Sequence, residues 1–264
     1  MWTLTHAITI FPTFVVLFAF AFLIGHLLKG KSELVRTIPL QLIAMALILM
    51  ELIKQVKAMP DYAAGNLYAL PFHYCSLFLY ILPLHSFCRV KPRPIIDALT
   101  VMLTASLFVN MFIMPANIYS ADNIKNLFRD YGSFHTVVFH NLVCLYGMLT
   151  ISLKAYKMKL GRDILISLAF LSAYVVIATI LSFSLDTNFH NLKECNIPFI
   201  GEFIVGLKTK LGGFGWIIQV IYDTLLFIAT LIMGVISYLA VYGVDKLICL
   251  FSKKGEEKLM QEAE

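Results

Sequence analysis

Charged residues are scarce in this sequence. Only 14% of its 264 residues are Asp, Glu, Lys or Arg, whereas 59% are hydrophobic, and the mean hydropathy is +0.81. Soluble domains contain about 45–50% apolar and about 25% charged residues. A chain this apolar cannot bury its nonpolar surface in one core surrounded by water, so the composition predicts an integral membrane protein.

Several chemical motifs are also missing. The five cysteines form no C-x-x-C pair and show no Cys/His spacing suited to zinc, which argues against a structural metal or a disulfide framework. No G-x-S-x-G nucleophile motif occurs, and no alternating pattern of a membrane β-barrel is present. The net charge of +5 is not gathered into a basic patch with interleaved aromatic residues, so no nucleic-acid partner is expected. No cofactor is predicted.

What the sequence does contain is a series of apolar runs long enough to cross a membrane as helices of about 20 residues. Helices are expected because lipid leaves no water to satisfy open backbone groups. The fold class is therefore predicted to be all-α, a seven-helix transmembrane bundle over residues 1–243, followed by a polar tail at 244–264. The expected spans are 8–28, 37–56, 68–88, 95–115, 131–153, 164–184 and 215–243.

The basic residues predict the orientation of these spans. Of the 21 Lys and Arg residues, 14 lie in connections 29–36, 89–94 and 154–163 and in the tail. Loops rich in Lys and Arg stay on the cytoplasmic side. We therefore expect an outer amino terminus, a cytoplasmic carboxyl terminus, and a multi-pass protein of the cell membrane.

Polar residues on four of the spans are predicted to meet at one depth, in the outer half of the membrane. They are Glu51, His73, Cys75, Ser76, Thr136, His140, Gln219 and Asp223. Polar groups that face lipid are costly, so such stripes usually face a bundle interior or a wet cavity. The alternative is that they only join helices by hydrogen bonds. The inner half shows little comparable polarity, and His85 is expected in the headgroup region.

The stretch LPFHYC, Leu70 to Cys75, combines a proline, a histidine and a thiol within a predicted span. On a regular helix His73 and Cys75 project about 200° apart, so both cannot face the same cavity. His73 and Ser76 then share a face, and Pro71 is tolerated in the first turn. Cys75 is either a reactive thiol or a small buried hydrophobe, as most free cysteines are.

Three segments carry a family resemblance: LPFHYC, YGSFHTVVFHNLV ending at Val143, and SLDTNFHNL from Ser184 to Leu192. In order and spacing they resemble the motifs of YwaF-like bacterial integral membrane proteins. Distant eukaryotic relatives of that family are regarded as lipid acyltransferases that work without coenzyme A, through a cysteine and a histidine. The resemblance implies that His140 matches the partner histidine. Phe72 stands where the relatives have their cysteine, so Cys75 would be a displaced substitute.

The first functional hypothesis is an enzyme that transfers or hydrolyses an acyl group of a membrane lipid. Cys75 or Ser76 would attack the ester and His73 or His140 would take the proton, oriented by Asp223 or Glu51. The residues expected to contact substrate are Glu51, Ser76, Thr136, Asn188 and Gln219.

The second hypothesis is a transporter or binding protein for a small solute or protons, with the same groups along its pathway. A third is a metal site, because His73, His140, Glu51 and Asp223 are suitable ligand types. A continuous water path to the cytoplasmic face would favour transport, and a pocket open sideways to lipid would favour the enzyme.

Overall fold

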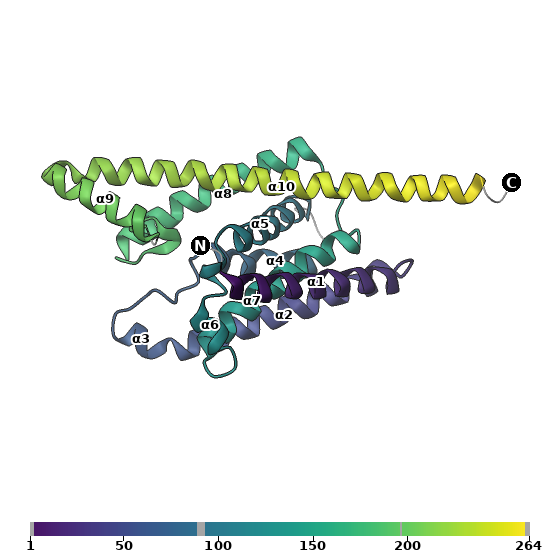
Figure 1. The fold of residues 1–264 in the computed structure, drawn as a ribbon, viewed down its shortest axis with the longest axis horizontal. Helices are drawn as coiled ribbons and strands as arrows, with labels where there is room; N and C mark the ends of the chain where they lie inside the picture. Colours follow the sequence, from purple (N-terminus) through teal and green to yellow (C-terminus); the bar gives the residue numbers. More distant parts are fainter. Residues whose placement is uncertain (1–2, 89–92, 196, 262–264) are drawn as a thin grey trace.

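The computed structural model describes residues 3–88, 93–195 and 197–261, and this part of the chain is helical throughout apart from its connections (Figure 1). The all-α prediction is therefore confirmed. The long helices are α1 (Leu4–Leu27), α2 (Glu33–Lys57), α5 (Arg93–Ile113), α7 (Tyr131–Ser152), α8 (Leu160–Ser184) and α10 (Gly215–Gln261). The short elements are α3 (Met59–Ala63), η1 (Tyr74–Ser76), α4 (Leu77–Phe87), η2 (Pro115–Asn117), α6 (Ala121–Lys125), η3 (Phe189–Asn191), α9 (Pro198–Leu211) and η4 (Gly212–Phe214).

The described helices include six stretches that are long and apolar enough to cross a membrane. The last of them, Phe199–Leu247, joins α9 to the first part of α10, and the shorter apolar helix Tyr74–Phe87 adds a further candidate. These segments correspond to the seven predicted spans. The chain is thus a multi-pass membrane protein, while its orientation in the membrane stays a prediction.

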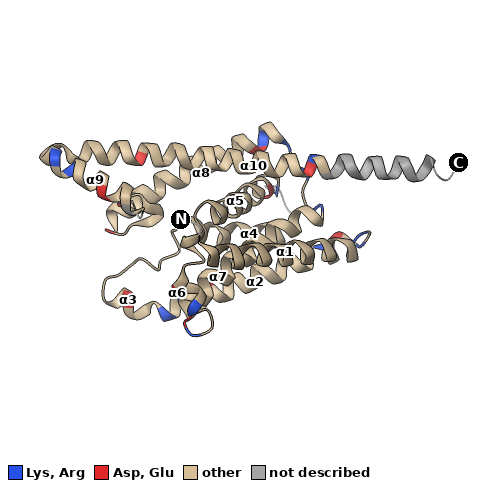
Figure 2. Cartoon of the chain, in the orientation of Figure 1, with Lys and Arg blue, Asp and Glu red and all other residues tan. Residues whose placement is uncertain are grey.

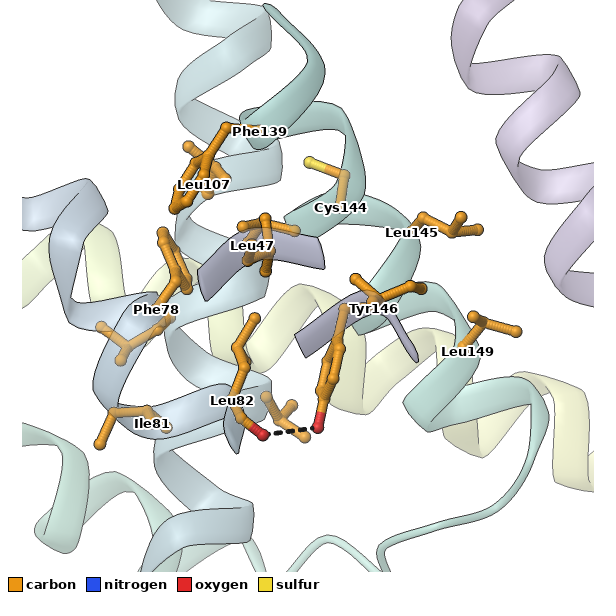
Figure 3. Packing of buried hydrophobic residues seen from close by; sticks show 14 of the residues in the cluster. Leu47, Phe78, Ile81, Leu82, Leu107, Phe139, Cys144, Leu145, Tyr146 and Leu149 are labelled. Carbon is orange, nitrogen blue, oxygen red and sulfur yellow. Dashed lines mark hydrogen bonds between the residues drawn. The ribbon is translucent and has the colours of Figure 1, made fainter. Parts of the chain in front are cut away.

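Helix α5 forms the centre of the bundle. It packs against α4, α7, α8 and α10, and most of its side chains are buried. Figure 3 shows the layer around it, in which Leu47, Phe78, Leu107 and Phe139 interlock. Phe78 is fully buried and Phe139 is only 1% exposed. The middle of the bundle is therefore a packed apolar layer.

The carboxyl-terminal part of the chain forms an extended helical hairpin. Helix α9 runs alongside the first part of α10, and the two project beyond the rest of the bundle (Figure 1). At about 1.5 Å per residue, the 47 residues of α10 span roughly 70 Å. The segment predicted as a polar tail is part of this helix as far as Gln261.

The helix predicted over 68–88 is wrong at its amino-terminal end, because helical structure begins only at Tyr74. The preceding residues form turns whose carbonyl groups accept hydrogen bonds from side chains. The Ala69 carbonyl accepts from Gln55 Nε2 at 2.8 Å, and the Phe72 carbonyl accepts from the Tyr174 hydroxyl at 3.3 Å. Non-helical backbone is tolerated at membrane depth where protein groups satisfy it in this way. The face shared by His73 and Ser76 on a regular helix therefore does not exist.

Candidate functional site

The site is built around this non-helical segment, which positions His73 as the residue before η1. His73 Nε2 lies 2.8 Å from the carbonyl oxygen of Tyr68. A carbonyl only accepts, so Nε2 carries the hydrogen and a neutral His73 has its lone pair on Nδ1. The rings of Tyr68 and Phe189 pack against the imidazole with centroid distances of 4.6 and 5.2 Å. His73 is therefore held in one orientation with a free basic nitrogen.

An open groove of about 330 Å³ lies beside His73, between α4 and α8. Its lining is almost entirely apolar. The lining residues are Pro71, Phe72, His73, Leu77, Tyr80, Ile81, Phe170, Ala173, Tyr174, Ile177, Ala178 and Leu181. The side chains of Tyr80 and Ile177 are 48% and 56% exposed on the outside of the bundle. The groove thus opens sideways, toward the surface that lipid would cover.

A buried acid lies close to this segment, on α2. Glu51 is 7% exposed, and its Oε1 accepts hydrogen bonds from Lys54 Nζ at 3.1 Å and from Gln55 Nε2 at 2.6 Å. Its Oε2 lies 3.2 Å from Nε2 of His135, which is 8% exposed. We call Glu51, Lys54, Gln55 and His135 the Glu51 cluster. Sequence reasoning left His135 out of the site, although its place one turn into α7 was a usable signal.

The second predicted base, His140, lies on α7 and is half-buried. Its Nδ1 donates to the backbone carbonyl of Thr136 at 2.5 Å, so a neutral imidazole has its lone pair on Nε2. Thr136 therefore contributes its backbone rather than its hydroxyl group.

The two candidate nucleophiles differ in accessibility. Cys75 is half-buried and packs against the apolar core, whereas Ser76 is only 3% exposed. Of the candidate residues, His73 lines the groove, and Cys75 lies two residues further along the chain, against the apolar core.

The remaining predicted residues form separate groups. On α10, Gln219 donates to Asp223 Oδ1 at 2.8 Å and to the Leu192 carbonyl at 2.7 Å, and it accepts from Lys208 on α9. In the described part of the chain, no hydrogen bond links Asp223 to the histidines of α7 or to Cys75. Asn188 Oδ1 accepts from the backbone N–H groups of Lys193 and Glu194 at 3.0 and 3.1 Å, which shapes the loop before α9.

One further histidine near the site was missed. His190 has a backbone φ of 52°, a left-handed conformation uncommon for residues other than glycine. Its Nε2 lies 3.2 Å from Thr230 Oγ1, and its ring stacks on Tyr74 with a centroid distance of 5.6 Å. The segment SLDTNFHNL thus positions an imidazole beside η1, a placement that no spacing rule indicates.

His85, on α4, belongs to a buried polar network that the sequence analysis did not predict, and its placement in the headgroup region stays a prediction. His85 is 3% exposed, and its Nδ1 lies 2.6 Å from the hydroxyl group of Tyr146. Tyr146 donates its own hydrogen to the Leu82 carbonyl at 3.0 Å (Figure 3). His85 Nε2 then faces Asp97 Oδ1 at 3.4 Å. No helical spacing indicates this network, because its members come from α4, α5 and α7.

In the described part of the chain, charged residues otherwise lie mainly near the helix ends, and few lie in the central parts of the helices (Figure 2). Among the described residues, no group of three or more His, Cys, Asp or Glu side chains is arranged to hold a metal ion. The proposed metal ligands therefore do not come together in this part of the chain.

A comparison with protein families gives one match: the model of the TMEM164 family covers residues 1–234. No curated protein matches the chain, and no solved structure does.

Proposed function

Since the chain belongs to the TMEM164 family, whose members are transmembrane proteins, we propose that it is a membrane enzyme that transfers or hydrolyses an acyl group of a lipid. The observation that carries this proposal is the apolar groove between α4 and α8, with the imidazole of His73 in its lining. Ligand pockets typically have volumes of about 300–1,000 Å³ and combine apolar walls with few polar groups. A groove of about 330 Å³ that opens sideways suits a single acyl chain entering from the bilayer.

His73 lines the groove, and we infer that Cys75, two residues further along the chain, is the nucleophile of covalent catalysis. In the proposed first step, a histidine takes the proton of the Cys75 thiol and the thiolate attacks the ester carbonyl. The acyl–oxygen bond breaks, the acyl group becomes a thioester, and the departing alcohol takes the proton from the imidazolium. In the second step a hydroxyl group of an acceptor lipid, or water, attacks the thioester and regenerates the thiol. His73 and His140 each have one nitrogen fixed by a backbone carbonyl and the other available as base.

The packing argues for this function over transport. Polar groups occur at both ends of the bundle, but Phe78 and Phe139 pack between them with almost no exposure. A solute or proton path would have to cross this apolar layer, whereas a lipid can reach the groove directly from the side.

The proposal is tested with full-length protein in vesicles that contain a phospholipid with a labelled acyl chain and a lysophospholipid acceptor. We expect label in the acceptor or in free fatty acid, strong loss of turnover in His140→Ala and Cys75→Ser, and little effect of Cys195→Ser, a change at a half-buried loop thiol. Hydroxylamine, which cleaves thioesters, should release label from wild-type protein only. Absence of any acyl movement, with wild type and His140→Ala alike, would reject the proposal.

A further inference from the structure

A second cavity, of about 470 Å³, lies at the opposite end of the bundle from the Glu51 cluster. It is formed by the first turns of α2 and α5, the connection between α7 and α8, and the start of α8. Its walls are unusually rich in cationic side chains. These are Arg36, Arg93, Lys154, Lys157, Lys159 and Arg162, against the acids Glu33 and Asp97.

Most of these cations have no anionic partner among the residues that the structure describes. Arg93 binds Glu33 at 2.8 Å and lies 3.8 Å from Asp97, and Arg162 binds Asp163 at 2.9 Å. The four others, which are Arg36, Lys154, Lys157 and Lys159, form no side-chain hydrogen bond or ion pair within the described residues. Even with Asp163 included, cations outnumber carboxylates two to one around this cavity. Like charges repel, so this excess favours binding of an external anion.

The walls are held rigidly, which lowers the entropic cost of binding. Asp163 is fully buried and accepts hydrogen bonds from the hydroxyl groups of Tyr156 at 2.7 Å and Tyr238 at 2.5 Å. It also accepts from the backbone N–H of Lys159 at 2.7 Å. These bonds tie the connection between α7 and α8 to α8 and α10. The buried Asp163 thus fixes the position of the connection between α7 and α8, which carries three lysines of the cavity wall.

Lys154 differs from the other lysines of the cavity in its backbone conformation. It follows the end of α7 with a φ of 49°, and the next N–H, of Ala155, donates to the Thr150 carbonyl at 3.0 Å. Glycine is the usual residue at this left-handed position of a helix end. A lysine here strains the backbone while placing a cation on the cavity wall.

We propose that this cavity binds a phosphate-bearing anion, supplied either by a lipid headgroup or by free phosphate. Arg guanidinium groups match phosphate oxygens in a forked geometry, and lysines add compact charge. Basic pockets between membrane helices commonly accept anionic headgroups. The site is separate from the proposed acyl-transfer groove and does not depend on that activity.

The test uses full-length protein in phosphatidylcholine nanodiscs, titrated with a fluorescent short-chain phosphatidic acid. We expect saturable binding that weakens with salt and is not competed by short-chain phosphatidylcholine. If inorganic phosphate displaces the probe only weakly, the ligand is a headgroup; if it displaces the probe at similar concentrations, the ligand is free phosphate. Equal competition by phosphatidylcholine would overturn the proposal.

Lys154 provides a variant that separates binding from folding. Lys154→Gly removes the charge and relieves the left-handed strain, so it should remain at least as thermally stable as wild type while binding the probe about tenfold more weakly. Lys154→Arg should retain binding, and Lys125→Gln, on α6, serves as a control for charge removal elsewhere. Wild-type affinity in both Lys154→Gly and Arg36→Gln would overturn the proposal.

Discussion

Glu51 on α2 and His135 on α7 are joined by a contact of 3.2 Å between Oε2 and Nε2, and both residues are buried. Their residues are 84 apart in the sequence. Lys54 and Gln55 complete the bonding of the carboxylate, so its charge is compensated inside the bundle. The pair therefore joins α2 to α7 inside the bundle.

Replacing the Glu51 carboxylate by an amide tests how much its charge stabilises the folded protein. Glu51→Gln keeps the shape but removes the charge that Lys54 and His135 face, so we expect a loss of about 1–3 kcal/mol in stability. Glu202→Gln, on the exposed face of α9, is the matched control and should change stability by less than about 0.5 kcal/mol. Thermal unfolding followed by size-exclusion chromatography measures both. Equal melting temperatures for Glu51→Gln and Glu202→Gln would show that the charge of Glu51 does not stabilise the folded protein.

The proposed lipid groove can be filled without disturbing the core. Ala173 lines the groove and is exposed, whereas Ala169, one turn earlier on α8, is exposed but lies outside it. We expect Ala173→Phe to lower acyl turnover about tenfold or more, because the ring would occupy the space of the acyl chain. The free energy of unfolding of both variants should match that of wild type to within about 0.5 kcal/mol. Equal turnover in Ala173→Phe and Ala169→Phe would rule the groove out as the substrate site.

The sequence was sufficient to predict the helical class and the long apolar helices, because the membrane constrains both strongly. It was not sufficient for the segment before η1. Gln55, Tyr80 and Tyr174 satisfy the backbone there, and they belong to three different helices. No local sequence pattern indicates such hydrogen bonds. The apolar stretch before η1 was therefore predicted to be part of a continuous helix.

The same limitation applies to the polar groups. Glu51 was identified as a member of the site because an acid within an apolar run is conspicuous. Its partner His135 and the buried pair of His85 and Asp97 were not identified, since their contacts depend on which helices face each other. Depth along a span can be counted from the sequence, but pairing across spans is set by packing.

Close packing of α5 against α7 gives a separate prediction. A Cβ atom added at Gly147 would lie 2.7 Å from Thr104 Oγ1 and 2.8 Å from Thr104 Cβ, which is too close for either helix to accept without moving. Gly147→Ala should therefore cost about 1–3 kcal/mol. At Gly161, on α8, no atom lies within 4 Å of the added Cβ, so Gly161→Ala should be neutral or stabilising by up to about 1 kcal/mol. A Gly147→Ala variant as stable as Gly161→Ala would contradict this packing.

Asp130, the N-cap of α7, predicts a dependence of stability on pH. Its Oδ2 accepts from the backbone N–H of Ser133 at 2.8 Å and from the Ser133 hydroxyl at 3.1 Å. The Ser133 N–H bond favours the ionised form and lowers the pKa of Asp130 below its ordinary value of 3.8. Because the folded pKa is the lower one, ionisation stabilises the folded protein fully above pH 3.8, and this contribution is lost as the pH falls through the folded pKa.

Two substitutions separate the cap from its charge. Asp130→Ala removes the acceptor and should cost about 1 kcal/mol at neutral pH. Asp130→Asn keeps an acceptor oxygen but cannot ionise, so its deficit relative to wild type should be smaller and should shrink below about pH 4. Melting temperatures of the three proteins, compared in one detergent across the acidic range, measure this convergence. A constant gap between wild type and Asp130→Asn at every pH would mean that the helix end does not stabilise the carboxylate charge, and that Asp130 caps α7 only as a hydrogen-bond acceptor.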